Sequence, residues 1–300
     1  MIITPASLVA LRTGFRADFQ GAFDVAESIY DKVATTVPST TASNTYGWLG
    51  QSTQMREWVG DRVISDMAAH AYAISNKDWE LTVGVKRTDI EDDNIGVYKP
   101  LMQEIGRAAK IHADEMVFNL LKAGETSLCY DGQNFFDIDH PVAANVDGTG
   151  AVTTVANMAV GAGPAWYLLD TSRSVRPLIY QERKPTAFTY MASETDEEVF
   201  MRKLFRFGVD GRSNVGFGLW QTAYKSTMPL TAANFSAAYA AMQSIKADGG
   251  RPLAIRPTVL VVPPNLREQA LIVTKAEYLQ GGGTNVNAGL VDTIVTPWVL

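Results

Sequence analysis

Residues 96–122 read GVYKPLMQEIGRAAKIHADEMVFNLLK, and they are the clearest single element of the chain. Pro100 suits the first turn of a helix, because its missing N–H would have no partner there. The acidic run at 91–94 predicts a cap and a favourable charge at the start, and Gly124 predicts the end. One helical face carries apolar and small residues, namely Met102, Ile105, Gly106, Ala109, Ala113, Met116, Val117 and Leu120. At 1.5 Å per residue this helix is about 40 Å long, which is enough to span a domain.

The residues ahead of this helix predict an arm and a long excursion. Residues 5–34 have helical content, with a strip made of Leu8, Leu11, Phe15, Phe19 and Phe23. Residues 35–47 are mostly small and polar and favour an extended connector. Residues 46–95 favour strands, with three tryptophans spread among glycines and charged residues. A two-stranded excursion of this kind is not stable alone in water, so we expect a neighbouring subunit to cover it and the apolar arm.

The rest of the chain predicts strands followed by a compact α/β unit. Residues 125–175 are rich in loops and glycine, and residues 177–224 favour strand. At 196–207 the pattern does not separate helix from strand. The last 70 or so residues predict, in order, a helix capped by Thr231, a strand at 258–262, a helix capped by Asn265 and a strand at 290–295.

Composition excludes several classes of protein. The 300 residues carry 26 Lys plus Arg and 32 Asp plus Glu, a formal net charge of -6, whereas a protein that wraps phosphate backbones normally has a basic surplus. Cys129 is the only cysteine, so neither an internal disulfide nor a cysteine-based zinc site is expected. No secretory signal and no apolar run of about 20 residues is present, which argues against secretion and against a membrane.

One short cluster offers ligands or acid–base groups. Asp137, Asp139 and His140 supply two carboxylates and an imidazole, which could hold a divalent cation and leave a metal-dependent enzyme as an alternative. They lie within four residues beside Pro141 and have no obvious distant partner, so a turn with local side-chain caps is the better interpretation. The patterns of a P-loop and of a nucleophile elbow are both absent. We therefore expect no catalytic residue, cofactor or metal.

Five blocks carry a resemblance over essentially the whole chain. They are residues 43–50 (SNTYGWLG), residues 89–96 (DIEDDNIG) running into 106–109 (GRAA), residues 129–136 (CYDGQNFF) with 139–141 (DHP), residues 177–184 (PLIYQERK) and residues 257–263 (PTVLVVP). None is a chemical motif, but their order and spacing match together. With these blocks the chain resembles the major head protein family of Mu-like phages and prophages.

The resemblance implies an α+β fold of the Hong Kong 97 capsid type. By position, residues 1–45 would be the N-terminal arm and residues 46–80 the extended loop. Residues 81–228 would form the peripheral domain, with its spine helix at 96–122, and residues 229–300 the axial domain. The function implied is that of a major capsid protein, which self-assembles into the icosahedral head around double-stranded DNA. A related nanocompartment shell of the encapsulin type, with a protein cargo, is the alternative.

The resemblance also implies partners. Copies of the chain would form hexamers and pentamers, helped during assembly by a separate scaffolding protein, a maturation protease and a portal. DNA would be held without sequence specificity, a decoration protein could be added, and assembly would occur in the cytoplasm of the host bacterium. We expect a shell without covalent crosslinks. Aromatic and arginine side chains are frequent interface anchors, and the contacts between subunits are expected at Phe15, Phe19, Phe23, Trp48, Arg56, Glu57 and Trp58.

Overall fold

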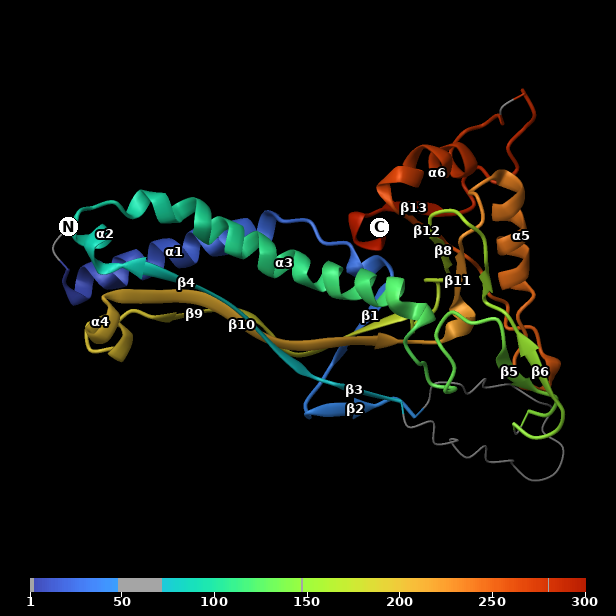
Figure 1. Cartoon of the computed structure of the whole chain (residues 1–300), viewed down its shortest axis with the longest axis horizontal. Coiled ribbons are helices and arrows are strands. Elements are labelled where there is room, and N and C mark those ends of the chain that lie inside the picture. The colour runs from blue at the N-terminus through green and yellow to red at the C-terminus, as the bar shows by residue number, and fades with distance from the viewer. Residues whose placement is uncertain (1–2, 48–71, 147, 280) are drawn as a thin grey trace.

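The chain is long and flat, with an elongated part and a compact body at one end (Figure 1). The computed structural model describes residues 3–47, 72–146, 148–279 and 281–300. Two long helices, two short ones and a four-stranded sheet build the described elongated part, and a five-stranded sheet with the last two α-helices builds the core of the body. The described N-terminal end lies at the far tip of the elongated part, and the C-terminus lies where the two parts meet.

The predicted long helix is present as α3, Lys99–Lys122. Pro100 stands in its first turn, as expected, and Gly124 follows it in a short 3-10 turn. The acidic cap is wrong: a 3-10 turn at Ile95–Tyr98 separates the acidic run from α3, and no side chain caps the helix start. The acidic run instead closes the short helix α2, Arg87–Glu91.

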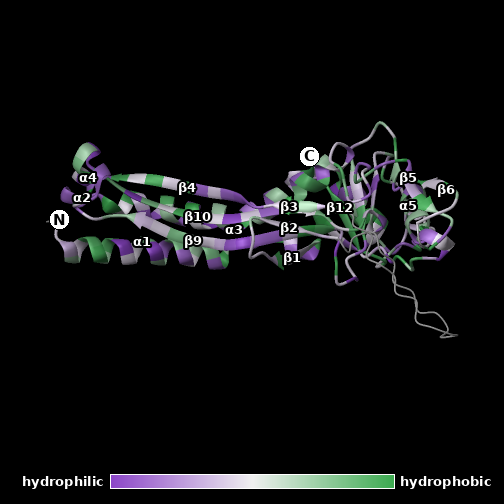
Figure 2. Ribbon diagram, turned by 90° about the horizontal axis from the view of Figure 1, so that it is seen from below, coloured by the Kyte–Doolittle hydropathy of each residue, from purple (hydrophilic) through white to green (hydrophobic). Residues whose placement is uncertain are grey.

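The helix of the arm, α1 (Pro5–Val25), lies along α3 (Figure 1). Thr4 and Ser7 form a capping box at its start, in which each side chain accepts the other residue's backbone N–H. Figure 2 shows hydrophobic and hydrophilic residues alternating along α1, as expected for a helix with one buried face. The two helices are in close contact at Gly106, where an added Cβ would lie 2.3 Å from the backbone oxygen of Phe19.

The elongated part is completed by a four-stranded sheet in the order β1-β9-β10-β4. The long antiparallel pair β9 and β10 forms its centre, β4 runs antiparallel to β10, and β1 is parallel to the first residues of β9. The bounds are Ala34–Pro38 for β1, Lys77–Lys86 for β4, Leu178–Met191 for β9 and Leu204–Phe217 for β10. Between β9 and β10, the undecided stretch contains both structures, because helix α4 (Glu197–Arg202) precedes the strand.

The sheet shortens the extended loop expected at 46–80. Strand β4 pairs with β10 from Lys77 onward, and β3 (Ala73–Ser75) pairs with β2 (Ser43–Thr45), so residues 73–75 and 77–80 belong to sheets. The central part of the expected loop, residues 48–71, lies outside the described residues. The loop contacts expected at Trp48, Arg56, Glu57 and Trp58 fall in that part.

The compact body is built on a five-stranded sheet in the order β13-β12-β8-β11-β7. The bounds are Met158–Ala159 for β7, Trp166–Leu169 for β8, Ala223–Ser226 for β11, Val259–Val262 for β12 and Asp292–Val295 for β13. Because β8 pairs with β12, strands before and after residue 229 share one sheet, and this sheet crosses the expected domain boundary at 229. A separate hairpin, β5 (His140–Ala143) with β6 (Val152–Val155), lies beside this sheet.

Two helices complete the body, and a side-chain cap is present at the N-terminus of only one of them. Helix α5, Ala232–Gln243, begins as predicted, because the Thr231 side chain accepts the Asn234 N–H. The cap expected at Asn265 is wrong, since a 3-10 turn at Pro264–Leu266 leads into α6, Arg267–Thr274, without a side-chain cap.

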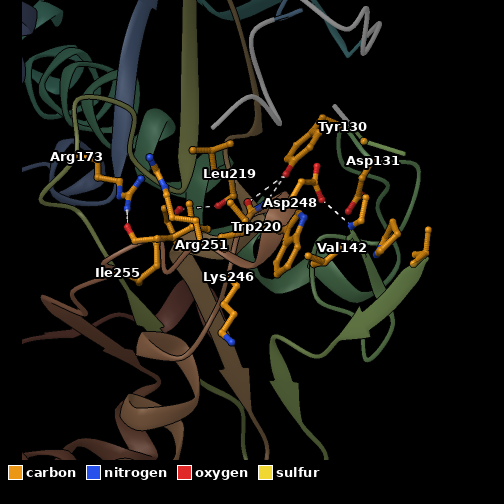
Figure 3. A pocket seen from close by; sticks show the side chains of 18 residues that line it. Tyr130, Asp131, Val142, Arg173, Leu219, Trp220, Lys246, Asp248, Arg251 and Ile255 are labelled. Carbon is orange, nitrogen blue, oxygen red and sulfur yellow. Dashed lines mark hydrogen bonds between the residues drawn. The ribbon is translucent and has the colours of Figure 1, made fainter. Parts of the chain in front are cut away.

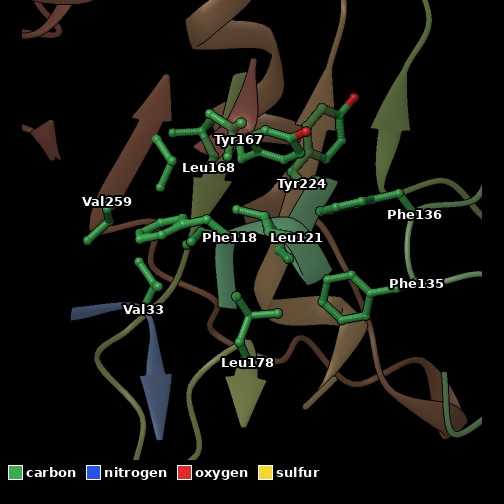
Figure 4. Close-up of a cluster of buried hydrophobic side chains, with 14 of the residues drawn as sticks. Val33, Phe118, Leu121, Phe135, Phe136, Tyr167, Leu168, Leu178, Tyr224 and Val259 are labelled. Atoms are coloured by element: carbon green, nitrogen blue, oxygen red, sulfur yellow. The ribbon is translucent and has the colours of Figure 1, made fainter. Parts of the chain in front are cut away.

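Two buried hydrophobic clusters hold the chain, and α3 contributes to both. Its first half, with Met102 and Ile105, packs with α1 and the elongated sheet. Its second half, with Phe118 and Leu121, enters the core of the body beside Tyr167 and Leu168 (Figure 4). The helix therefore joins the two parts by packing, as a spine.

Candidate functional site

The structure does not bring Asp137, Asp139 and His140 together as one site. The Asp137 side chain accepts the N–H of Ile138 at 2.7 Å, which is a local turn contact. Asp139 is exposed, and its hydrogen bond with Asp137 raises the pKa of its carboxyl group. His140 is fully buried and its Nδ1 lies 2.8 Å from Oδ2 of a different residue, Asp131.

Asp131 is the centre of a buried hydrogen-bond hub that the sequence did not reveal. Besides His140, its carboxylate accepts the Cys129 thiol at 3.0 Å and the Gln133 N–H at 3.0 Å. Burial alone would raise the pKa of Asp131, but the bonds from His140 and Cys129 outweigh it and lower that pKa. The only available signal was that Cys129, Asp131 and His140 occur in one matching block.

The hub has the composition of a metal site, but its carboxylate is already engaged by hydrogen bonds, and the only hub atom among the buried polar side-chain atoms without a partner in the described residues is His140 Nε2. Ligand atoms of Cys129, Asp131 and His140 lie within 4.8 Å of one another. Both carboxylate oxygens, however, already accept hydrogen bonds from the thiol and the imidazole. Burial and the neighbouring carboxylate raise the pKa of the Cys129 thiol, so it is a poor nucleophile and a poor metal ligand. The hub therefore holds a turn in place.

The hub fastens the β5–β6 hairpin to the body. The His140 ring stacks on the indole of Trp220, with ring centroids 4.0 Å apart and planes inclined by 7°. At the other end of β5, the Asp248 carboxylate accepts the N–H of Ala143 at 2.7 Å. Contacts from three distant parts of the sequence thus fix the hairpin's position.

A cavity of about 330 Å³ opens next to the hub (Figure 3). Its polar side chains serve the fold: Tyr130 bonds to Gln221, Asp248 holds Ala143, and the Arg173 guanidinium donates to the Leu253 carbonyl. In the part of the chain that the structure describes, we find no nucleophile–base pair in this cavity. The cavity is a gap between the hairpin and the 246–255 segment, not a catalytic centre.

The expected contact residues of the arm have different environments. Phe15 and Phe19 are buried in their own chain, where Phe15 packs edge-on against Phe207 at 5.0 Å. The premise that the arm cannot cover its apolar side chains is therefore wrong for these two residues, because α3 and the sheet cover them. Phe23 is only half-buried, beneath the ammonium group of Lys110.

Exposed apolar side chains are concentrated at both ends of the molecule. At the tip of the elongated part, α4 exposes Phe200 (83%) and Met201, close to the end of β9. The body exposes aliphatic residues on the β5–β6 hairpin and on the loop after α6. Large exposed apolar groups mark association surfaces more often than they mark chemistry. None of the described helices is both long and apolar enough to cross a bilayer.

These features define a class: a structural subunit with the Hong Kong 97-type capsid fold, built for association with other subunits. The chain belongs to the family described as the Mu-like prophage major head subunit gpT, which matches residues 8–299. Membership confirms the resemblance, the α+β capsid fold and the role of a head subunit, which is a structural protein and not an enzyme. Nothing in it favours the nanocompartment alternative.

Two curated relatives cover nearly the whole chain. The Mu-like prophage FluMu major head subunit of Haemophilus influenzae is 49% identical over 95% of this chain and 94% of its own length. The major capsid protein of Escherichia phage Mu is 47% identical over 96% of this chain and 95% of its own length.

Solved structures agree with this family. The subunit of the bacteriophage JBD30 procapsid is similar with a TM-score of 0.87 and 60% identity, covering 99% of this chain and 100% of that one. The subunit of the JBD30 capsid has a TM-score of 0.76 and 48% identity, with 100% of both chains covered. The subunit of a JBD30 capsid decorated with minor capsid protein trimers is similar with a TM-score of 0.78 and 44% identity, and 100% of both chains is covered.

Proposed function

We propose that this chain forms the wall of an icosahedral head, in which hexamers and pentamers of the subunit enclose double-stranded phage DNA. The observation that supports this most directly is the flat, two-part subunit with exposed apolar groups at both ends, in a chain of the head-subunit family. A scaffolding protein, a maturation protease and a portal would assist assembly in the host cytoplasm. A decoration protein is a further proposed partner.

We define the proposed domains by the two large sheets rather than by the boundaries expected from the sequence. We assign α1, α3 and the four-stranded sheet to the peripheral domain. The five-stranded sheet, α5, α6 and the β5–β6 hairpin form the axial domain, which therefore includes β7, β8 and β11 as well as residues 229–300. Residues 48–71 remain the proposed core of the extended loop, and the contacts at Trp48, Arg56, Glu57, Trp58 and the half-buried Phe23 remain proposals.

A loop deletion tests this function. Residues 48–71 are replaced by two glycines, which leaves Thr45 opposite Ala73 in the β2–β3 pair. We expect a folded, soluble subunit that forms no shells in negative-stain micrographs, while the unaltered chain forms shells under the same conditions. Normal shells from the deletion variant would refute the loop assignment, and an unaltered chain that forms no shells even with its scaffolding protein present would refute the function.

The wall is expected to hold DNA loosely and to lack covalent links. With a net charge of -6, the free subunit should bind duplex DNA weakly and without sequence preference at physiological salt. Shells boiled in SDS should release monomers on a gel. Nanomolar sequence-specific binding, or a persistent ladder of multimers, would contradict these two expectations.

A further inference from the structure

Two neighbouring loops of the body, which we call the basic loops, carry a local surplus of positive charge. They are residues 170–176, between β8 and β9, and residues 245–258, ahead of β12. They lie at the same end of the five-stranded sheet, because β8 ends where the antiparallel β12 begins. Their cationic residues are Arg173, Arg176, Lys246, Arg251 and Arg256. The whole chain, in contrast, has a net charge of -6.

The basic loops contain two carboxylates, and the fold engages both of them. Asp170 is fully buried, accepts the N–H of Arg256 at 2.9 Å and lies 3.6 Å from Nε of Arg173. Asp248 accepts the N–H of Ala143 at 2.7 Å. Even if each carboxylate cancels one of the five cations, the basic loops keep a surplus of three positive charges.

Other carboxylates of the body are directed away from the basic loops or paired elsewhere. Figure 3 shows Arg173 and Arg251 at one end of the cavity beside the hub and Asp131 at the other end. Asp292, at the start of β13, forms an ion pair with Lys275 at 3.8 Å. The positive charge of the basic loops is therefore concentrated in one region of the body.

The second basic loop is held in a strained and fixed shape. The N–H of Ala247 donates to the carbonyl of Arg251 at 2.8 Å, and the guanidinium of Arg173 donates to the carbonyl of Leu253. Ala254 has a φ of 51°, a backbone conformation that residues other than glycine rarely adopt. Such strain persists only where the surrounding contacts enforce it, and it is concentrated at functional sites. A fixed backbone also lowers the entropic cost of binding.

We propose that the basic loops are the surface of this subunit that contacts the phosphate groups of the enclosed duplex DNA. Guanidinium groups pair with phosphate through two parallel N–H···O bonds, and a lysine adds a point charge. Contacts of this kind do not depend on the base sequence. A chain of net charge -6 repels DNA overall, so a locally positive surface is required for close approach. The inference rests on the proposed function and names the surface that meets the DNA.

Two double variants of the full chain, matched in charge, test this contact. The basic-loop variant combines Lys246→Gln with Arg256→Gln, at two exposed positions. The control variant combines Arg16→Gln with Arg183→Gln, at two exposed arginines of α1 and β9 in the elongated part. Both variants lose the same charge, so only its location differs. Fluorescence anisotropy measures the binding of a short labelled duplex DNA between about 50 and 200 mM salt.

The two variants should differ in affinity and in salt dependence. Each phosphate contact that is lost lowers the slope of log K against log salt by about 0.9, so the basic-loop variant should lose about 2 in slope. At about 50 mM salt it should bind at least about tenfold more weakly, whereas the control variant should stay within about twofold of the unaltered chain. Circular dichroism checks the fold, and if a double variant is unfolded, Lys246→Gln is compared with Arg16→Gln instead.

Several results would overturn the proposal. Equal losses in the two variants would show that overall charge, and not the basic loops, governs binding. No binding of DNA by the unaltered chain at the lowest salt would also overturn it. Stronger binding of polyglutamate than of duplex DNA would indicate an acidic protein as the partner and not a nucleic acid.

Negative-stain microscopy with the scaffolding protein present separates this proposal from the proposed function. Normal shells from both variants, together with equal DNA binding, would overturn only the role of the basic loops. An unaltered chain that forms no shells would overturn the proposed function, whatever the binding measurement shows.

Discussion

Gly106 sets the distance between the arm helix and the spine helix. A Cβ at this position would lie 2.3 Å from the Phe19 carbonyl oxygen and 3.1 Å from the Phe23 nitrogen, both of which are backbone atoms that cannot turn aside. Gly106→Ala should therefore lower the free energy of unfolding by about 1–3 kcal/mol, the usual cost of overpacking, as measured by urea denaturation.

Gly14 provides the matched control, because it lies inside α1 with no atom within 4 Å of an added Cβ. Gly14→Ala should stabilise the chain by about 0.4–1 kcal/mol, since alanine restricts the unfolded chain and suits a helix. Equal effects of the two substitutions would contradict the close helix contact.

Asp131 makes stability depend on pH. Its pKa in the folded chain is lowered, so its contribution is complete above about pH 5 and disappears as the pH falls through the folded pKa. Asp131→Asn should cost about 1.5–3 kcal/mol at pH 7, the range for hydrogen bonds to a charged group. The difference in the free energy of unfolding between the variant and the unaltered chain, measured by urea denaturation, should become smaller toward pH 3.

The exposed Asp139 serves for comparison with Asp131. Asp139→Asn should leave the free energy of unfolding almost unchanged, as surface substitutions usually do. If the loss in the free energy of unfolding caused by Asp131→Asn stays constant from pH 7 to pH 3, the result would argue against a charged carboxylate in the hub.

Local caps show which residue-level predictions succeed. Pro100 and Thr231 were predicted correctly, because a missing N–H and a short hydroxyl act within one helical turn. The acidic run at 91–94 failed as a cap because a 3-10 turn separates it from α3, and Asn265 failed because it lies inside the 3-10 turn that leads into α6. The partner of His140 lies nine residues away across a folded turn, which no local pattern can reveal.

At the scale of elements, Asp114 ties the arm to the spine helix. This buried carboxylate on α3 accepts the Ser28 hydroxyl at 2.8 Å and the N–H groups of Ile29 and Tyr30 at 2.9 and 2.7 Å. Asp114→Ala leaves these donors unpaired, so we expect a loss of about 2–4 kcal/mol from several broken bonds to a charged group. Hydrogen exchange at the amides of Ile29 and Tyr30 should become markedly faster.

The adjacent, exposed Glu115 is the control for that measurement. Glu115→Ala should leave stability within about 0.5 kcal/mol and exchange at the two amides unchanged. Unchanged exchange in Asp114→Ala would show that the arm is held by other contacts.

Elements were predictable where their pattern is periodic and long. The helical stripes of α1, α3 and α5 show the period of a helix with one buried face, and all three helices formed. The stretch 196–207 could not be decided because α4 is only a short turn of helix joined directly to β10. Short elements take their structure from the sheet they join, which local propensity does not encode.

At the scale of the whole molecule, α3 couples the elongated part to the body. Because the helix supplies buried side chains to both clusters, neither part should lose its structure while the other keeps it. Met102→Ala in the first cluster and Phe118→Ala in the second should each cost about 2–5 kcal/mol. Both should lower one common melting temperature, as followed by far-UV circular dichroism and by tryptophan fluorescence. Two separate transitions, each moved by only one of the variants, would contradict this coupling.

The sequence by itself determined the elements with a repeating apolar face, the acidic and nearly cysteine-free composition, and, through the order of its matching blocks, the family. Those properties depend on neighbours along the chain or on the residues as a set. Only the tertiary structure decided that Phe15 and Phe19 are covered within the subunit, that strands from both sides of residue 229 share one sheet, and that His140 pairs with Asp131. Each of these depends on contacts between residues brought together by folding, and the energy of such a contact depends on burial and geometry that a linear pattern does not contain.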